Sequence, residues 1–262
     1  MFPTIELFGR EIGYYPLMVL CGVFAIGIYV SVTSEKRKYD YTDAIIFLLI
    51  IVIGLMVGGH LLYALVNYKS FSVFGDIENI NTPAKFFNAL SLVLGGNVFY
   101  GGLIGSIIAG YILVRKNNEY KKYVDIIVVG VPLFHFFGRI GCFLGGCCFG
   151  IESKIGFIYK YNPIEIANGV RRFPVQLLEA SFNLFLFFLL HYLLCKRKFE
   201  NKLIYVYLTI YATGRFFLEF LRGDAYRGIW FSLSTSQIIS ILIILAIIVI
   251  HIRKAIFLRS SR

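Results

Sequence analysis

The feature that most limits the fold of this chain is a series of seven apolar runs, each roughly 20 residues long. They cover residues 15–32, 44–66, 97–114, 124–143, 174–195, 203–220 and 232–252. A helix of about 20 apolar residues crosses the roughly 30 Å of hydrocarbon in a bilayer. The runs therefore predict an all-α integral membrane protein with about seven transmembrane helices.

The composition agrees with lipid as the main solvent. Apolar residues make up 58% of the chain and charged residues 16%, whereas soluble domains have about 45–50% and about 25%. The net charge of +11 comes from short clusters between the runs, and no recognition module is visible, so no nucleic-acid partner is expected. Glu6, Arg10 and Glu11 precede the first run, which is not the start of a signal peptide. We predict one transmembrane domain, residues 1–262, with the first run retained.

The distribution of cations predicts the orientation in the membrane. Of the 26 Lys and Arg residues, 15 lie in the short segments after the first, third, fifth and seventh runs. Short basic segments stay in the cytoplasm. This predicts an outer N-terminus and a cytoplasmic C-terminus. The long connectors 67–96 and 144–173 then face outward, where we expect re-entrant or interfacial pieces and a helix start at Asn81-Thr82-Pro83.

The sixth run contains charges that lipid disfavours. An Arg or Asp at the centre of a membrane helix costs about 2.5–3.5 kcal/mol on insertion scales, so such a charge marks a candidate functional site. Tyr211, Arg215, Glu219 and Arg222 follow at spacings that place them on one helical face. One interpretation is a self-neutralising Arg215–Glu219 pair. The interpretation we favour is a cationic groove for an anionic lipid headgroup, in which Glu219 orients Arg215 for bidentate contact with phosphate.

The fourth run ends in a second unusual segment, which contains Arg139, Cys142, Cys147, Cys148 and Gly150. The cysteines allow four interpretations. A metal site would require a second ligand pair, and the other two cysteines lie in other runs. A disulfide fits an oxidising outer face. A reactive thiol fits the neighbouring guanidinium of Arg139, and small apolar packing residues are the fourth interpretation. We expect no metal and no cofactor.

Other candidates lie at or near the ends of runs. Gly101 and Gly102 follow Tyr100, and backbone N–H groups in such a glycine-rich turn can receive a phosphate or carbonyl oxygen. His60 in the second run is either a core histidine or a base. Gln176 opens the fifth run with Glu179 on the same helical face.

Taken in order, these blocks resemble the prolipoprotein diacylglyceryl transferases of bacteria over essentially the whole chain. The matching blocks are Tyr15-Pro16-Leu17-Met18, Gly58-Gly59-His60-Leu61, Tyr100-Gly101-Gly102-Leu103, Gly138-Arg139-Ile140-Gly141 with Gly150, Pro174-Val175-Gln176-Leu177-Leu178-Glu179, and Tyr211 to Arg222. Four positions depart from the family pattern. Tyr100 replaces a His, His60 replaces an Arg, and Cys142 and Cys147 replace an Asn and a Glu. The chain is therefore similar to a divergent, cysteine-containing branch.

The resemblance implies a transferase of the bacterial cytoplasmic (inner) membrane that acts in lipoprotein biosynthesis. It would move the diacylglyceryl group of phosphatidylglycerol to the thiol of a prolipoprotein lipobox cysteine. Arg139 and Arg215 would clamp the phosphate and stabilise charge on the leaving oxygen, and Tyr100 or His60 would accept the thiol proton. The substrate-binding residues implied are Tyr15, Gly101, Gly102, Gln176, Tyr211, Glu219, Arg222, Cys142, Cys147 and Gly150.

Two other functions fit the same residues. One is a related transferase that uses phosphatidylglycerol with a small-molecule or other non-lipoprotein acceptor, which the substitutions at Tyr100 and the cysteines favour. The other is a non-catalytic lipid-binding membrane protein that keeps the fold without the chemistry.

Overall fold

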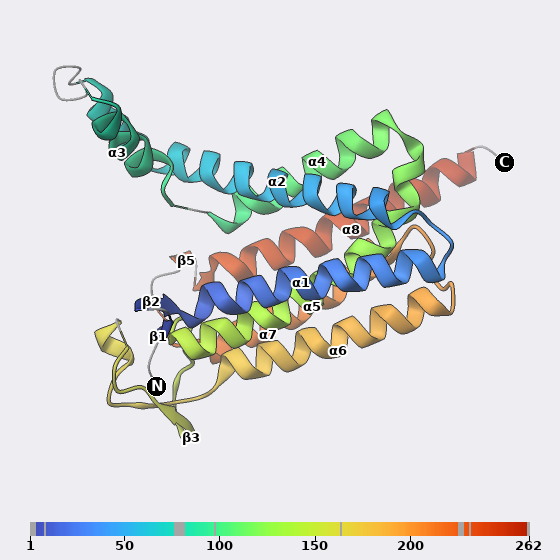
Figure 1. Cartoon of the computed structure of the whole chain (residues 1–262). Helices are drawn as coiled ribbons and strands as arrows, with labels where there is room; N and C mark the ends of the chain where they lie inside the picture. Colours follow the sequence, from blue (N-terminus) through green and yellow to red (C-terminus); the bar gives the residue numbers. More distant parts are fainter. Residues whose placement is uncertain are drawn as a thin grey trace. The chain divides into compact units, whose positions relative to one another are not determined.

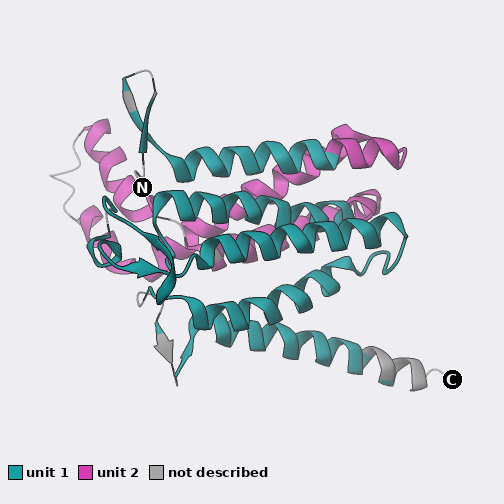
Figure 2. Cartoon of the chain, turned by 90° about the horizontal axis from the view of Figure 1, so that it is seen from below, with its two compact units in different colours: residues 1–30, 124–262 teal, residues 31–123 magenta. Residues whose placement is uncertain are grey.

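The computed structural model describes residues 4–7, 9–75, 82–96, 98–162, 164–224, 228–230 and 232–260, which are mostly helical (Figure 1). The chain divides into two compact units, coloured separately in Figure 2. The first unit holds residues 1–30 and 124–262, and the second holds residues 31–123.

Long helices form the frame of the first unit. They are α1 (Tyr14–Lys36), α5 (Lys121–Gly145), α6 (Val175–Cys195), α7 (Leu203–Leu218) and α8 (Thr235–Ser260). Residues 31–36 of α1 and 121–123 of α5 belong to the second unit. A 3.0 Å hydrogen bond between Tyr29 and His191 joins α1 to α6. Gln237 of α8 donates to the Phe216 carbonyl of α7 over 3.4 Å. These helices run alongside one another, so side chains from several of them meet inside the bundle.

In the described part of the first unit, three small antiparallel sheets lie before and between the long helices, where the sequence predicts none. They pair β1 (Thr4–Leu7) with β2 (Arg10–Gly13), β3 (Glu152–Ile158) with β4 (Arg171–Arg172), and β5 (Ile229–Trp230) with β6 (Leu233–Ser234). Strands of two to seven residues leave no long hydrophobic alternation in the sequence. The all-helical prediction therefore holds for the membrane-length elements and not for these connections.

The connector 144–173 has a small core of its own, formed by Phe149, Tyr159 and Ala167. The connector also contains the 3-10 helix η4 (Glu165–Ala167). The buried Arg172 guanidinium lies 4.3 Å above the Phe149 ring and donates to the carbonyl of Gly150. This packing holds the segment after α5 in a defined position, and Gly150 of this segment forms a β-bridge with Arg222.

The second unit contains α2 (Tyr41–Val66), η1 (Tyr68–Gly75), α3 (Pro83–Leu94), α4 (Phe99–Lys116) and η3 (Asn118–Tyr120). The predicted helix start is confirmed at Thr82 and Pro83. The Thr82 hydroxyl accepts a 3.4 Å hydrogen bond from the Lys85 amide, and Pro83 occupies the first turn. Asn81 lies outside the described residues.

Glycines let α2 and α4 approach with their backbones in contact. A Cβ atom built at Gly58 would lie 2.2 Å from the Gly101 carbonyl oxygen, and one at Gly105 would lie 2.1 Å from that of Gly54. Small residues allow such close contacts between helices in lipid. In the structure Gly101 therefore contributes to helix packing.

We expect Gly58→Ala to lower the free energy of unfolding by about 1–3 kcal/mol, because the added methyl group forces two backbones apart. Gly110→Ala is the matched control on α4, since a Cβ there would meet its neighbours at 3.7 Å or more. Thermal unfolding in detergent measures both. Equal stability of the two variants would contradict the packing argument.

Five helices in the described part of the chain are long and apolar enough to cross a membrane: Tyr14–Lys36, Tyr41–Val66, Asn118–Gly145, Val175–Cys195 and Thr235–Arg253. The other two predicted spans form α4 and α7. The 18 residues of α4 end in Arg115 and Lys116, and α7 has 16 residues, about 24 Å at 1.5 Å per residue. Position 97, where the third predicted span begins, lies outside the described residues.

Candidate functional site

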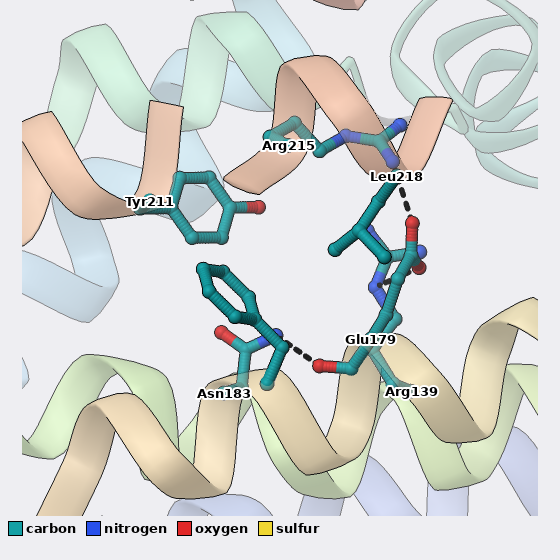
Figure 3. A pocket seen from close by; sticks show the side chains of 7 residues that line it. Arg139, Glu179, Asn183, Tyr211, Arg215 and Leu218 are labelled. Carbon is teal, nitrogen blue, oxygen red and sulfur yellow. Dashed lines mark hydrogen bonds and ion pairs between the residues drawn. The ribbon is translucent and has the colours of Figure 1, made fainter. Parts of the chain in front are cut away.

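A buried carboxylate joins the two predicted clamp arginines in the first unit (Figure 3). Glu179 Oε1 accepts a 2.5 Å hydrogen bond from Arg215, and Glu179 Oε2 lies 3.0 Å from Arg139 Nε. The Glu179 side chain is 3% exposed. Arg215 also pairs with Glu219 at 2.6 Å, which confirms the predicted pair one helical turn apart. Burying so many charges is tolerated because each one has a partner of opposite sign.

Three helices supply this network. Arg139 lies on α5, Glu179 on α6 and Arg215 on α7. Gly214 permits the close approach of α7 to α6, since a Cβ atom there would lie 2.2 Å from the Phe182 ring. A larger residue at 214 would push Arg215 away from Glu179.

A small pocket lies beside the network. It is lined by Arg139, Glu179, Phe182, Asn183, Tyr211, Arg215 and Leu218 (Figure 3). Its free volume is about 10 Å³, the space of about one water molecule and far below the roughly 300–1,000 Å³ of pockets for drug-sized ligands. The pocket as it stands is smaller than a phosphate, and its two arginines rather than its size favour an anionic group.

Arg139 has N–H groups that can donate hydrogen bonds to an anionic group such as a phosphate. Its Nε forms the ion pair with Glu179 Oε2, yet that oxygen accepts no hydrogen bond within the described part of the chain. A guanidinium has five N–H donors in a fork that matches two oxygens of a phosphate. With its side chain 21% exposed, Arg139 can keep its ion pair and still bind an anion.

Arg222 lies beyond the end of α7 in a separate ion pair. The helix ends at Leu218 and continues as the 3-10 helix η5 (Glu219–Leu221). Arg222 then forms a bidentate contact with Asp224, at 2.8 and 3.1 Å. It forms a β-bridge with Gly150, where a Cβ atom would lie 2.2 Å from the Phe173 carbonyl oxygen. In the structure Gly150 therefore lets three chain segments meet.

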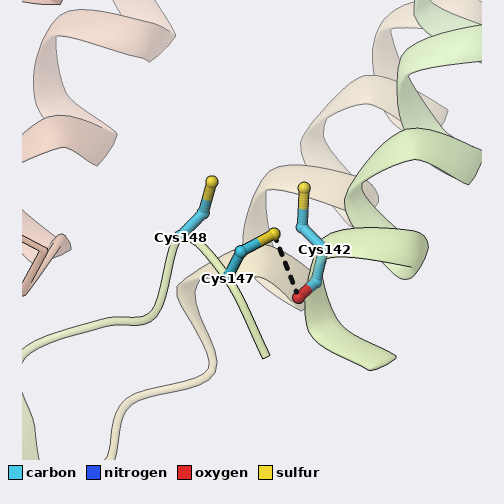
Figure 4. Close-up of side chains that lie close together, drawn as sticks. All are labelled: Cys142, Cys147 and Cys148. Carbon is cyan, nitrogen blue, oxygen red and sulfur yellow. Dashed lines mark hydrogen bonds between the residues drawn. The ribbon is translucent and has the colours of Figure 1, made fainter. Parts of the chain in front are cut away.

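Three cysteines meet where α5 ends (Figure 4). The Sγ atoms of Cys142, Cys147 and Cys148 lie within 4.8 Å of one another, and all three thiols are free. The Cys147 thiol donates to the Cys142 carbonyl over 3.8 Å. The pKa of Cys148 is lowered, because its proximity to the thiols of Cys142 and Cys147 and the charges of Arg222 and Arg139 favour its thiolate. The sequence suggested a thiol next to Arg139, and the structure adds that three sulfurs converge.

Tyr15 and Gln176 lie around the same end of the bundle. A Cβ atom at Gly141 would lie 3.2 Å from the Tyr15 ring, so Tyr15 packs against α5 between Arg139 and the cysteines. The buried Gln176 amide donates to the Cys147 carbonyl over 2.9 Å and to the Tyr159 hydroxyl over 3.1 Å. Gln176 thus positions the segment that carries Cys147.

The remaining predicted residues lie in the second unit. His60 Nδ1 lies 2.6 Å from the Leu94 carbonyl oxygen and 2.8 Å from that of Gly96, so it carries the proton and donates. In the neutral ring Nε2 is then the proton acceptor. Tyr100 and Gly102 lie in the first turn of α4, and the Gly102 amide donates to the Val98 carbonyl over 3.2 Å.

Glu179 is a residue of the candidate site that the sequence analysis did not assign to it. Two signals were present, since a Glu inside a 20-residue apolar run is costly and it shares a helical face with Gln176. The missing information was its partner, because Arg139 and Arg215 precede and follow Glu179 by 40 and 36 residues. Only the packing of α5, α6 and α7 brings them together.

Residues 3–253 match the family model described as prolipoprotein diacylglyceryl transferase. The chain belongs to this family. The match confirms the resemblance seen in the sequence and extends over both units. Membership makes the chain a transferase of the kind that uses phosphatidylglycerol, and its long apolar helices make it a multi-pass membrane protein.

Relatives support this membership at full length. A phosphatidylglycerol–prolipoprotein diacylglyceryl transferase of Clostridium tetani is 36% identical over 253 residues, which cover 95% of this chain and 96% of the relative. Transferase 2 of the same description in Clostridium perfringens is 33% identical, with 94% and 92% covered. The Chlorobaculum tepidum transferase is 33% identical, with 94% and 87% covered.

Proposed function

We propose that this chain transfers the diacylglyceryl group of phosphatidylglycerol to the cysteine thiol of a prolipoprotein and releases glycerol phosphate. The observation that carries the proposal is the Arg139–Glu179–Arg215 network beside a small pocket, in a chain whose full-length relatives bear that name. The match over residues 3–253 also favours one domain, 1–262, that includes both units.

The network suits this reaction because charge grows on the phosphate during transfer. As the bond between the diacylglyceryl carbon and the phosphate oxygen breaks, a phosphodiester with one negative charge becomes a monoester with up to two. Arg139 and Arg215 stabilise that charge from fixed positions, which is worth more than a flexible contact. Glu219 pairs with Arg215, Tyr211 lines the pocket beside it, and Arg222 serves as a further cation at the end of α7.

The thiol must lose its proton to attack. The proposed acceptors are His60, through Nε2, and Tyr100. Tyr15, Gln176, Gly101, Gly102, Cys142, Cys147 and Gly150 are the further residues that we propose to bind or support the substrates. Several of them also have the packing contacts described above.

Transfer is tested with purified protein, phosphatidylglycerol labelled in the diacylglyceryl group, and a lipobox peptide. Mass spectrometry is expected to find the label on the peptide cysteine. Label on another acceptor favours the alternative transferase, which has a non-lipoprotein acceptor. The substitutions at Tyr100, Cys142 and Cys147 support that alternative. Binding of lipid without any product favours a non-catalytic protein.

We propose that α4 and α7 complete seven spans in the bacterial inner membrane, with the N-terminus outside and the C-terminus in the cytoplasm. The support is the concentration of Lys and Arg in alternate short connectors. On this arrangement the connectors 67–96 and 144–173 face outward, with the cysteine cluster near the outer surface.

Orientation predicts the labelling of engineered thiols in intact cells. In a background without the native cysteines, a Cys at Asn201 is expected to stay unlabelled by an impermeant thiol reagent, since residue 201 lies in a cytoplasmic connector. A Cys at exposed Lys154 in the outer connector is the matched control and is expected to react. Labelling at residue 201 without labelling at residue 154 would show that the chain has the opposite orientation in the membrane.

A further inference from the structure

Cys142, Cys147 and Cys148 have the geometry of a metal site. Their sulfur atoms lie within 4.8 Å of one another. Around a tetrahedral Zn²⁺ with Zn–S bonds of about 2.3 Å, the sulfurs are about 3.8 Å apart. Closing the cluster on an ion therefore needs shifts of about 1 Å or less, which small side-chain rotations supply. Gln176 holds the Cys147 carbonyl at 2.9 Å, so the backbone that presents this sulfur is already anchored.

The surroundings favour a site with net negative charge. Zn²⁺ with three thiolates carries a charge of −1, and a fourth thiolate makes it −2. Arg139 precedes Cys142 by three residues on α5, about 5–6 Å between Cβ atoms on one helix face. Arg222 is bridged to Gly150, two residues after Cys148. Arg139 and Arg222 also pair with Glu179 and Asp224, so their guanidinium groups on two sides offset part of the charge that the thiolates would bring.

The number of ligands points to an open coordination position. The cluster found in the described part of the chain holds three cysteines and no His, Asp or Glu. Catalytic zinc sites have three protein ligands and leave the fourth position for water or substrate. We expected no metal from the sequence because it lacks a second ligand pair. Three ligands suffice, however, when the substrate is itself a thiol.

We propose that Cys142, Cys147 and Cys148 bind Zn²⁺ and that the acceptor thiol of the prolipoprotein occupies its fourth coordination position. This inference rests on the proposed transfer to a thiol. It gives the cysteines a role in presenting the acceptor close to Arg139, at the end of α5 where the donor's phosphate is expected to bind.

The chemistry balances without an oxidant. Each cysteine loses its proton to solvent as the metal binds, and a coordinated acceptor thiol is deprotonated as well, its proton passing to the base or to water. The bound sulfur attacks the diacylglyceryl carbon and forms the C–S bond. The C–O bond breaks, and its electron pair leaves with the phosphate oxygen as glycerol phosphate. The neutral thioether is a weak ligand, so the product dissociates from zinc.

Metal binding is tested without reference to activity. Full-length protein in detergent is titrated with Co²⁺, which replaces Zn²⁺ and gives strong sulfur-to-metal charge-transfer absorption. We expect one ion per chain with three thiolate ligands, displaced by Zn²⁺. Cys147→Ser and Cys148→Ser are each expected to weaken binding by more than about 100-fold. Cys195→Ser, at an exposed cysteine at the end of α6, is the matched control and is expected to bind as the parent does.

The acceptor position is tested on the Co²⁺ form with two peptides. A lipobox peptide is expected to raise the charge-transfer absorption as a fourth thiolate binds, and its Cys→Ser analogue is expected to leave the spectrum unchanged.

Removal of zinc by a chelator is expected to lower transfer at least 10-fold, with recovery on adding ZnCl₂. Full transfer by the metal-free protein, or no Co²⁺ binding by folded protein, overturns the inference and leaves the transferase function standing. Metal and peptide binding without transfer to any thiol refutes the proposed function instead.

Discussion

Arg215→Lys is expected to lower kcat by about 100-fold or more while the protein still inserts and folds. Arg215 contacts Glu179 at 2.5 Å, Glu219 at 2.6 Å and Ser236 at 3.3 Å through two different nitrogens. A lysine ammonium keeps the charge but cannot reproduce this planar fork. Removal of one donor to a developing oxyanion costs about 10²–10³ in kcat, so loss of the fork falls in that range.

Arg215→Ala is expected to abolish transfer, and it also leaves two buried carboxylates without this partner, which costs about 3–5 kcal/mol of stability. The lysine variant therefore separates chemistry from folding. Arg197→Lys is the control, because its side chain is 80% exposed and lies 3.9 Å from Glu200. Initial rates with labelled phosphatidylglycerol, with thermal unfolding of the same samples, decide the outcome. Parent-like kcat for Arg215→Lys would exclude Arg215 from the clamp.

Arg139→Ala is expected to abolish transfer as well, and Arg139→Lys to impair it. Among the residues that the structure describes, Arg139 makes a single ion pair, with Glu179, so its removal disturbs the network less than removal of Arg215. We therefore expect Arg139→Ala to remain better folded than Arg215→Ala. Comparison of their unfolding temperatures checks the order.

The helices of this protein were predictable because lipid leaves the backbone one local way to satisfy its hydrogen bonds. The run predicted at 174–195 forms α6 (Val175–Cys195), and the run at 203–220 begins α7 at Leu203. The end of α7 differs. Its helix stops at Leu218, because Glu219 to Leu221 tighten into a 3-10 turn that leads to the β-bridge at Arg222. The partner of Arg222 in that bridge is Gly150, which is far away in the sequence, so the local residue pattern does not predict where α7 ends.

Most residues of the candidate site were predictable one by one, Glu179 excepted, but the contacts between them were not. Arg215 and Glu219 are four residues apart on one helix, so their pairing follows from spacing alone. The contacts of Glu179 depend on how three helices pack, for which the sequence carries no comparable signal. The cysteines fall between these cases. Their positions within seven residues suggested a cluster, and the turn after α5 that brings the sulfurs within 4.8 Å emerged only from the structure.

Glu179→Gln is expected to lower kcat by about 10–100-fold while the affinity for phosphatidylglycerol stays equal or increases. Arg139, Arg215, Glu179 and Glu219 together carry no net charge, so the parent network binds an anionic headgroup only by sharing donors with its own carboxylates. Glutamine keeps the shape and one acceptor oxygen but removes one negative charge. The headgroup then meets a network with a charge of +1, which strengthens ground-state binding.

The expected fall in kcat has a different cause, the loss of the fixed positions of the two guanidinium groups. Glu179 accepts from Arg215 on one oxygen and pairs with Arg139 on the other, so it sets the distance between the two guanidinium groups. An amide has one acceptor oxygen, and its NH₂ group repels the second guanidinium. That guanidinium then rotates away from the position where charge develops, and preorganisation is lost. The signature is a lower kcat with an unchanged or lower KM for the lipid, which simple unfolding does not produce.

Glu200→Gln, at a side chain that is 53% exposed, is the matched control and is expected to leave both constants unchanged. If Glu179→Gln instead raises KM and keeps kcat, Glu179 serves to bind the lipid and not to position the arginines.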